Sequence, residues 1–135
     1  MITPHEAVEM VNNLSQLFAV TSPGLCLDDK AIENKPNILA ALIVDEDMIV
    51  LRSELIHPRL IAHEIGHHVY HAYNDWSCPN PKMCEAWAQY FEVMWMADGF
   101  KFKCDVCYSR GPVRMLETGD VMCLSCGSIY GIDFY

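Results

Sequence analysis

Apolar residues recur at helical spacing near the start of the chain. The residues that recur at the spacing of a helix with 3.6 residues per turn are Ala7, Val8, Val11, Leu14 and Phe18. The preceding segment Thr-Pro-His-Glu at residues 3–6 is typical of a helix start, because the threonine can cap the helix, the proline fits its first turn and the glutamate completes a capping box. A Thr-Ser-Pro-Gly run then interrupts the pattern. We therefore expect an N-terminal helix that serves as core scaffolding.

Two further helices are predicted around a short break. The first opens at His57-Pro58 and runs to about residue 73, where Asn-Asp and then Pro-Asn-Pro end it. The second runs from about residue 81 to 97 and stops at Asp98-Gly99. Its large apolar side chains are expected in the core, and they are Trp87, Phe91, Met94 and Trp95.

Short apolar stretches with β-prone residues predict two hairpins. Residues 38–44 and 48–51 flank an Asp-Glu-Asp turn, and residues 113–116 and 121–124 flank a Thr-Gly turn. Helices and hairpins together predict an α+β fold. The pattern changes near Gly99, so we expect two units, residues 1–99 and residues 100–135.

Composition limits the size and setting of this fold. The 135 residues allow one modest domain with a small appendage, and 52% apolar residues indicate a globular chain. No apolar run approaches the roughly 18 residues that a membrane span requires. The first residues lack the basic and apolar blocks of a signal peptide, so we expect a cytoplasmic protein without membrane partners.

The net charge of −9 is unevenly distributed. Residues 1–99 carry 5 basic and 14 acidic side chains, whereas residues 100–135 carry 4 of each. An acidic surface repels phosphate backbones, which disfavours nucleic acid as a partner. The C-terminal unit offers only a weak basic cluster, and its aromatic residues favour contact with protein. The basic residues are Lys101, Lys103, Arg110 and Arg114, and the aromatic ones are Tyr108, Tyr130, Phe134 and Tyr135.

The second predicted helix carries an HExxH motif at residues 63–67. Two histidines four residues apart project from one face of a helix, so His63 and His67 can bind the same metal ion. Glu64 is placed to act as a general base on a zinc-bound water, whose pKa the metal lowers to about 7. The motif favours a zinc-dependent hydrolase.

A catalytic zinc ion commonly has three protein ligands, so one more is needed. His67 lies roughly 9 Å before the end of its helix and Glu85 roughly 6 Å into the next, which matches their heights if the helices are antiparallel. Glu92, roughly 10 Å further along, is the second choice. His68 and His71 are interpreted as surface or supporting residues. The donor that stabilises the oxyanion stays open among Tyr70, Tyr73 and His71.

These residues resemble the ImmA/IrrE-type metallopeptidases, over about residues 38–98. The matching positions are His63, Glu64, Gly66 and His67 of an HExGH motif, followed by Glu85, Ala88 and Phe91 of an ExxAxxF pattern. The resemblance implies a small zincin-like domain and a gluzincin-like site with Glu85 as third ligand. It also implies a protein substrate of the kind that known members cleave, a helix-turn-helix transcriptional repressor. The chain differs from that family after Phe91 and in its cysteine-containing C-terminal unit.

Four of the seven cysteines form two CxxC pairs separated by fifteen residues. The pairs are Cys104 with Cys107 and Cys123 with Cys126. This spacing is typical of a zinc ribbon, in which four thiolates hold one structural zinc ion. The chain is therefore expected to bind one catalytic and one structural zinc ion. Cys26, Cys78 and Cys84 are interpreted as free thiols without a role.

Three functions are compatible with these patterns. The first is a zinc metalloendopeptidase acting on a regulatory protein, with Glu64 as its catalytic residue. The second is a DNA-associated protease similar to the SprT family, which also joins HExxH to a cysteine ribbon. That family uses a histidine as third ligand, and no histidine follows His71, so it ranks second. The third is a non-catalytic module that zinc stabilises for protein binding.

Overall fold

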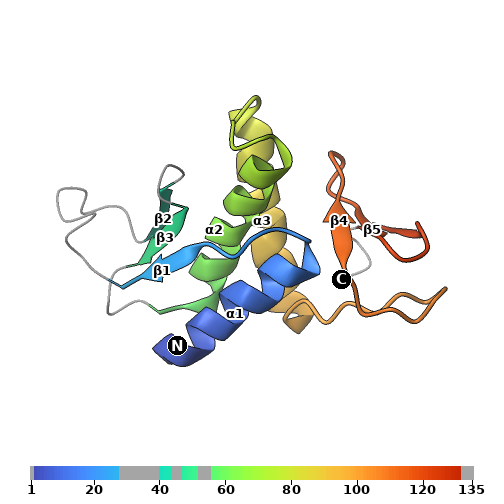
Figure 1. Ribbon diagram of the computed structural model, residues 1–135, viewed down its shortest axis with the longest axis horizontal. Coiled ribbons are helices and arrows are strands. Elements are labelled where there is room, and N and C mark those ends of the chain that lie inside the picture. The colour runs from blue at the N-terminus through green and yellow to red at the C-terminus, as the bar shows by residue number, and fades with distance from the viewer. Residues whose placement is uncertain (1, 28–39, 44–46, 52–55, 132–135) are drawn as a thin grey trace.

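The structure is a computed structural model that describes residues 2–27, 40–43, 47–51 and 56–131. Within these residues the fold is α+β, with three helices and two small sheets. Figure 1 shows helix α1 (Pro4–Leu17) crossing a pair of adjacent helices, with one sheet on each side of the helical layer. The predicted α+β class is confirmed.

Helix α1 begins and ends close to where its sequence predicts. Thr3 caps it, since the Thr3 hydroxyl accepts the Glu6 N–H at 3.1 Å and the Glu6 carboxylate accepts the Thr3 N–H at 3.1 Å. Its inward face packs on the second helix and buries most of the side chains that the spacing selected, whereas Val8 is 46% exposed. The buried apolar residues are Ala7, Met10, Val11 and Leu14.

Helices α2 (Pro58–Tyr73) and α3 (Pro81–Asp98) lie side by side and run antiparallel (Figure 1). They approach closely at Gly66, where an added Cβ would lie 2.6 Å from the Ala88 Cα. Only a glycine allows the two backbones to come this near. Asn80 caps α3, and Gly99 ends it in a left-handed conformation. Both helices are confirmed.

The N-terminal sheet has the order β1-β3-β2. Strands β2 (Ala40–Ile43) and β3 (Met48–Leu51) pair antiparallel, as the first predicted hairpin requires, while residues 38–39 and 44–46 lie outside the described residues. Strand β1 (Gly24–Cys26) pairs parallel with β3 and was not predicted. Strand β2 is an edge of the sheet as far as the structure describes it, and it contacts α2.

The second sheet belongs to the C-terminal unit, residues 100–131. Strands β4 (Val113–Met115) and β5 (Val121–Cys123) form the second predicted hairpin, and β6 (Ile129–Tyr130) adds a third antiparallel strand that was not predicted. The unit packs on the helices: the Arg114 guanidinium lies 4.1 Å from the centre of the Tyr73 ring. A Cβ added at Gly119 would lie 2.6 Å from the Tyr90 ring.

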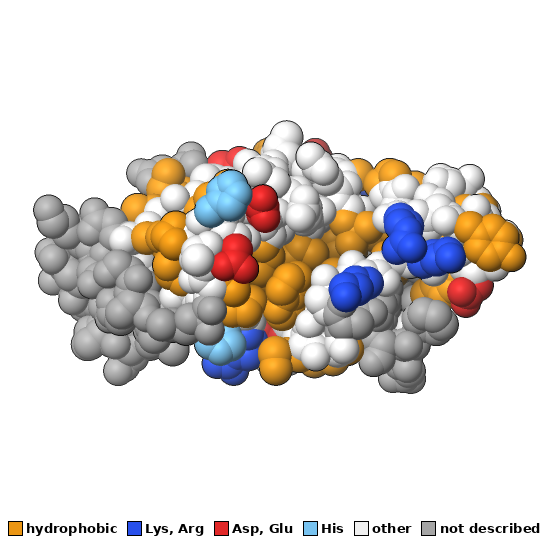
Figure 2. All heavy atoms as spheres, turned by 90° about the horizontal axis from the view of Figure 1, so that it is seen from below, with side chains coloured by type: hydrophobic (Ala, Val, Ile, Leu, Met, Phe, Trp, Pro, Cys, Tyr) orange, Lys and Arg blue, Asp and Glu red, His pale blue; other side chains and the backbone are white. Residues whose placement is uncertain are grey.

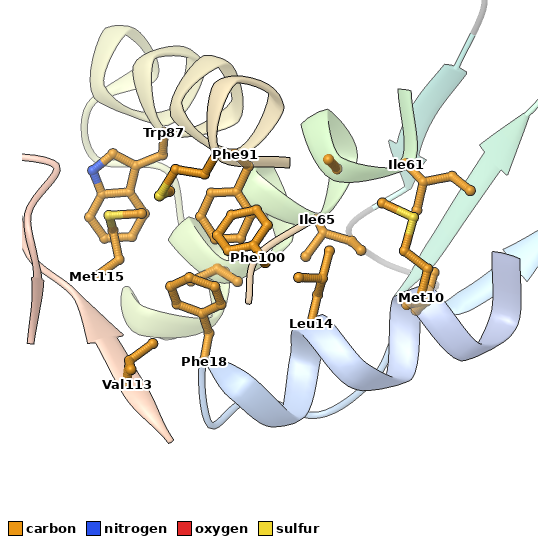
Figure 3. Close-up of a cluster of buried hydrophobic side chains, with 14 of the residues drawn as sticks. Met10, Leu14, Phe18, Ile61, Ile65, Trp87, Phe91, Phe100, Val113 and Met115 are labelled. Carbon is orange, nitrogen blue, oxygen red and sulfur yellow. The ribbon is translucent and has the colours of Figure 1, made fainter. Parts of the chain in front are cut away.

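One hydrophobic core runs from the helices into the C-terminal unit (Figure 3). The Phe100 ring lies 5.5 Å from the Phe18 ring and 5.2 Å from the Phe91 ring, so α1, α3 and the start of the unit meet there. Trp87, Phe91 and Met94 are buried as expected, and the core also takes in Val113 and Met115 from β4. The two predicted units therefore share one core.

The surface repeats the charge asymmetry of the sequence. On the face in Figure 2, most lysine and arginine side chains gather over the end of the molecule formed by the C-terminal unit, and acidic side chains lie both over the helices and at that end. Phe134 and Tyr135 lie outside the described residues. Among the described residues, none of the helices combines the length and apolar character needed to cross a bilayer.

Candidate metal centres

The first candidate centre lies where α2 and α3 face each other. His63 and His67 stand one turn apart on α2, with ring centres 4.9 Å apart. From α3, the two carboxylate oxygens of Glu85 reach them: Oε1 lies 3.5 Å from His63 Nε2 and Oε2 lies 3.2 Å from His67 Nε2. One donor atom from each of the three residues lies within 4.8 Å of the others. We call this group the helical site.

The distances in the helical site fit a zinc ion. Two ligands that each lie about 2.0–2.1 Å from a tetrahedral zinc ion are about 3.3–3.4 Å apart. The two N···O distances, 3.5 Å and 3.2 Å, bracket that value. Two imidazoles and a carboxylate are donors that zinc accepts. Since 51% of the Glu85 side chain is exposed, the site opens to solvent on the side of α3.

Glu92 lies behind His63. Its Oε1 contacts Nδ1 of His63, the ring nitrogen that faces away from Glu85. Glu92 therefore does not lie where a third ligand of the helical site would be. This differs from the sequence analysis, which made Glu92 the second choice for that ligand. A proton on Nδ1 that is donated to this carboxylate leaves the lone pair of Nε2 free for a metal ion and fixes the ring orientation.

His67 has an equivalent partner in Cys84. Its Nδ1 lies 2.9 Å from the Cys84 Sγ, and Cys84 is buried at the start of α3, directly before Glu85. Burial and the neighbouring His63 lower the pKa of His67, which favours the neutral imidazole that binds metals. Burial also raises the pKa of the Cys84 thiol to about 12. No pattern in the sequence predicted this contact.

Glu64 lies beside the helical site and contributes no atom to it. Its side chain is buried at 7% exposure, and this burial is the main reason why its pKa rises to about 7. The carboxylates of Glu85 and Glu92 raise the pKa further, whereas the charge of His63 and the Leu42 N–H lower it. A carboxyl group with this pKa can take up and release a proton near neutral pH.

A hollow of about 330 Å³ opens in front of Glu64. His67 and His71 from α2, Cys84 from α3 and Leu42 from the edge strand β2 line it together with Glu64. The hollow thus exposes the buried carboxyl group and one histidine of the helical site to a molecule that binds along β2.

Of the three proposed oxyanion donors, only His71 lines the hollow. The Tyr70 hydroxyl accepts the Asn80 N–H at 2.9 Å, and the Tyr73 hydroxyl donates to the Phe18 carbonyl oxygen at 2.9 Å. Both tyrosines line a different cavity, between the helices and the C-terminal unit. Their hydroxyl groups serve the fold.

His68 has a structural place rather than a surface one. It is buried at 1% exposure, and its Nε2 lies 2.6 Å from the Thr21 carbonyl oxygen. Its Nδ1 lies 3.2 Å from Asp47 Oδ1. Because Thr21 leads into β1 and Asp47 into β3, His68 ties α2 to the starts of two paired strands. Of the two interpretations that the sequence left open for His68, surface or supporting residue, its burial and contacts favour the supporting one.

The second candidate centre is the group Cys104, Cys107, Cys123 and Cys126, which we call the cysteine cluster. Its sulfur atoms lie 3.5 Å apart between Cys104 and Cys126 and 3.7 Å apart between Cys107 and Cys123. Thiolates about 2.3 Å from a tetrahedral zinc ion would be about 3.8 Å apart. These four cysteines could therefore hold a metal ion such as zinc.

Hydrogen bonds surround the cysteine cluster. The Val106 and Cys107 N–H groups point at the Cys104 sulfur, at 3.4 Å and 3.5 Å, and the Tyr130 hydroxyl lies 3.0 Å from it. Desolvation opposes ionisation of Cys104, but these hydrogen bonds outweigh it and bring its pKa to about 6. The Cys126 thiol donates to the Ser128 hydroxyl at 3.1 Å, and hydrogen bonding with Ser128 lowers the pKa of Cys126. The CxxC spacing predicted that the four sulfur atoms converge, but it did not predict the contact of Tyr130 with Cys104.

A third group combines His71, Cys78 and Cys84, with one donor atom from each residue within 4.8 Å of the others. The sequence interpretation gave these two cysteines no role, because no fixed spacing links them to His71. All seven cysteines are free thiols in the structure.

Comparison of the chain with models of protein families, with curated proteins and with solved structures gives no match. The resemblance to ImmA/IrrE-type metallopeptidases therefore rests on the motif positions alone.

Proposed function

We propose that this chain is a zinc metalloendopeptidase of the gluzincin type, which hydrolyses a peptide bond in a protein substrate. One observation carries the proposal: both Nε2 atoms of the HExxH histidines converge on the carboxylate of Glu85, directly beside the buried Glu64. Residues 1–99 would then form a zincin-like domain similar to the ImmA/IrrE family, and residues 100–135 a zinc ribbon.

The chemistry divides between the ligands and Glu64. Zinc bound by His63, His67 and Glu85 would lower the pKa of a water molecule and polarise the substrate carbonyl. Glu64 would accept the proton of the attacking water and pass it to the leaving amine, because its buried carboxyl group lies beside the three ligands. Glu92 and Cys84 would hold the two imidazoles in position through their Nδ1 atoms.

The edge strand β2 supports a protein substrate in extended form. The Leu42 N–H of β2 already reaches the Glu64 carboxylate, so the edge of the sheet and the base are neighbours. A segment that adds to this edge as a further strand would carry its backbone carbonyls past Glu64. A flexible segment of a regulatory protein fits this geometry, and a helix-turn-helix repressor is the candidate that the family resemblance suggests.

The cysteine cluster is proposed to hold a structural zinc ion. Four thiolates complete a tetrahedral site and leave no position for a substrate. The strands around the cluster span only two or three residues each, so the unit has little core of its own and would gain folding free energy from the metal.

The test is the variant Glu64→Gln, which keeps the shape of the side chain and removes the base. We expect it to retain the zinc content of the wild type and to lose about 10²–10⁴-fold in the rate of cleavage. Fragments released from a cognate cell extract, identified by mass spectrometry, provide the measurement. The matched control is Glu9→Gln, an exposed carboxylate on α1, which should cleave normally. Equal fragments from Glu64→Gln and the wild type would remove Glu64 as the base.

A further inference from the structure

Three side chains from separate segments converge beside the helical site. His71 lies in the last turn of α2, Cys78 in the loop that follows, and Cys84 in the first turn of α3. One donor atom of each lies within 4.8 Å of the others, and His71 Nε2 lies 3.9 Å from Cys84 Sγ. No ligand is shared with the helical site or with the cysteine cluster.

We propose that His71, Cys78 and Cys84 form a separate metal site for a thiophilic ion such as Zn²⁺, Cd²⁺ or Cu⁺. Two thiolates and an imidazole are a soft donor set, which favours these ions over Mg²⁺ or Ca²⁺. Binding displaces one proton from each thiol, so two protons are released for each ion bound. The site stands on this geometry and does not depend on the proposed peptidase function.

The tautomer of His71 prepares its ring for a metal ion. Its Nδ1 lies 3.0 Å from the Ser77 carbonyl oxygen, which can only accept a hydrogen bond. The proton of a neutral ring must therefore be on Nδ1, and the lone pair on Nε2 points toward Cys84. This is the same arrangement as at His63, where a hydrogen-bond acceptor also occupies the far nitrogen.

The loop that carries Cys78 is held by several hydrogen bonds. The Trp76 N–H donates to the His71 carbonyl oxygen at 2.7 Å, and the Ser77 N–H donates to the Asn74 carbonyl oxygen at 3.1 Å. On the other side of Cys78, the Asn80 N–H donates to the Tyr70 hydroxyl at 2.9 Å. The cysteine is thus fixed on both sides, close to the two helix-borne ligands.

The spacing requires little adjustment. An imidazole nitrogen and a thiolate bound to one tetrahedral zinc ion are about 3.6 Å apart, given bond lengths of about 2.0–2.1 Å and 2.3 Å. The observed separation of 3.9 Å between His71 Nε2 and Cys84 Sγ exceeds this by a few tenths of an ångström. Rotation of the exposed Cys78 side chain can bring the third donor to the same point.

The position of the site has a consequence for the hollow. All three ligands line the same hollow of about 330 Å³ as Glu64 and His67, and three protein ligands leave one position of a tetrahedral ion open toward it. Cys84 Sγ also contacts His67 Nδ1, a hydrogen bond that a thiolate can accept while it binds a metal. An ion bound here would narrow the hollow in front of Glu64.

The test counts metal ions on the full-length protein. Protein saturated with Zn²⁺ is kept reduced with a phosphine, titrated with Cd²⁺ and examined by native mass spectrometry. We expect the wild type to bind one ion at each of the three groups, and Cys78→Ser and His71→Gln each to bind one ion fewer. Cys78 is exposed, so its replacement leaves the core intact. The matched control Cys26→Ser should bind as many ions as the wild type.

Two outcomes would overturn the proposal. One is a wild type that binds no more ions than Cys78→Ser, and the other is an equal loss in Cys26→Ser. The variant Glu85→Ala separates this site from the helical site, because it should also lose one ion and the double variant Glu85→Ala/Cys78→Ser should lose two. If Glu85→Ala loses none while Cys78→Ser loses one, the peptidase proposal fails and the present one stands. Cadmium NMR adds a signature, since an ion with two sulfur ligands resonates apart from one with four.

Discussion

The helical site and the cysteine cluster are both spaced for a single metal ion, but their surroundings differ. In the helical site the donors project from two long helices, Glu85 is half exposed, and a hollow with a buried carboxyl group adjoins it. In the cluster four sulfurs face one another, and backbone N–H groups and a phenol complete the shell. Donor spacing thus indicates a metal, whereas the surroundings indicate its task.

The two regions also differ in what holds them together. Helices α2 and α3 are in contact along their lengths, with a core that contains Ile65, Trp87 and Phe91. The C-terminal unit has three strands of two or three residues, and its buried residues include two of its own cysteines. We therefore expect loss of metal to damage the C-terminal unit far more than the helices.

The largest expected effect is that of Cys104→Ser in the cysteine cluster. A structural zinc site is worth on the order of 10 kcal/mol, so removal of one buried thiolate should unfold residues 100–131. Amide hydrogen exchange should show loss of protection in β4 and β5 and retained protection in α2. The control is Cys26→Ser, with the same chemical change in the N-terminal sheet. Unchanged protection in Cys104→Ser would show that the unit folds without metal.

Gly66→Ala should be the most damaging change in the helical region that leaves every donor in place. The added methyl group would meet the Ala88 Cα at 2.6 Å and the Trp87 carbonyl oxygen at 2.9 Å, and backbone atoms cannot rotate away. We expect a loss of about 3 kcal/mol in the free energy of unfolding, although alanine is favoured over glycine by about 1 kcal/mol within helices. Urea denaturation measures it. A stabilised variant would mean that the helices are further apart than described.

Glu64→Gln should alter the pH dependence of stability as well as activity. The pKa of Glu64 is raised from 4.5 to about 7, so the folded protein binds this proton more tightly than the unfolded chain. The resulting stability is fully present below pH 4.5 and is lost as the pH rises through 7. The comparison is made in a Glu85→Ala background, which empties the helical site. There the free energy of unfolding of the Glu64→Gln variant, relative to that of the protein with Glu64, should rise by about 2 kcal/mol between pH 5 and pH 8. Thermal unfolding at both pH values provides the comparison, and a constant difference would contradict the burial argument.

The smallest of these effects is expected for Glu92→Gln. Replacement of the carboxylate behind His63 weakens the hydrogen bond to Nδ1, and such changes lower metal affinity by about 10–100-fold. Competition with a zinc chelator measures the affinity of the helical site, and the cysteine cluster of the same molecule serves as internal reference. Glu9→Gln should leave both affinities unchanged. Complete loss of one ion from Glu92→Gln would instead make Glu92 a direct ligand.

Local patterns predicted most of the elements. Thr3 marked the start of α1 because its side chain caps the helix, and Gly99 marked the end of α3 because glycine readily adopts a left-handed conformation. Both effects depend on neighbouring residues only. Strand β1 was missed because it is three residues long and begins at the glycine of a Pro-Gly turn signal, and its partner β3 lies more than twenty residues away. No local pattern of residues indicates that two strands so far apart in the sequence will pair in parallel.

The candidate site shows the same limit. The HExxH spacing and the antiparallel helices were enough to expect Glu85 opposite His63 and His67. The contacts on the far side of the rings could not be expected, because they depend on how α2 and α3 are rotated about their axes. Glu92 meets His63 and Cys84 meets His67 across a helix pair whose close packing requires a glycine at position 66.

Phe100 couples the stability of the C-terminal unit to that of the helices. Its ring is wedged between Phe18 and Phe91, and Phe91 belongs to the helix that carries Glu85. If the C-terminal unit loses its metal and unfolds, the Phe100 ring leaves the core and α3 loses part of its packing. Binding of the two proposed ions is then thermodynamically linked. An ion in the cysteine cluster raises the affinity of the helical site for its own ion, and by reciprocity an ion in the helical site raises the affinity of the cluster. At limiting zinc, the protein would fill both centres cooperatively.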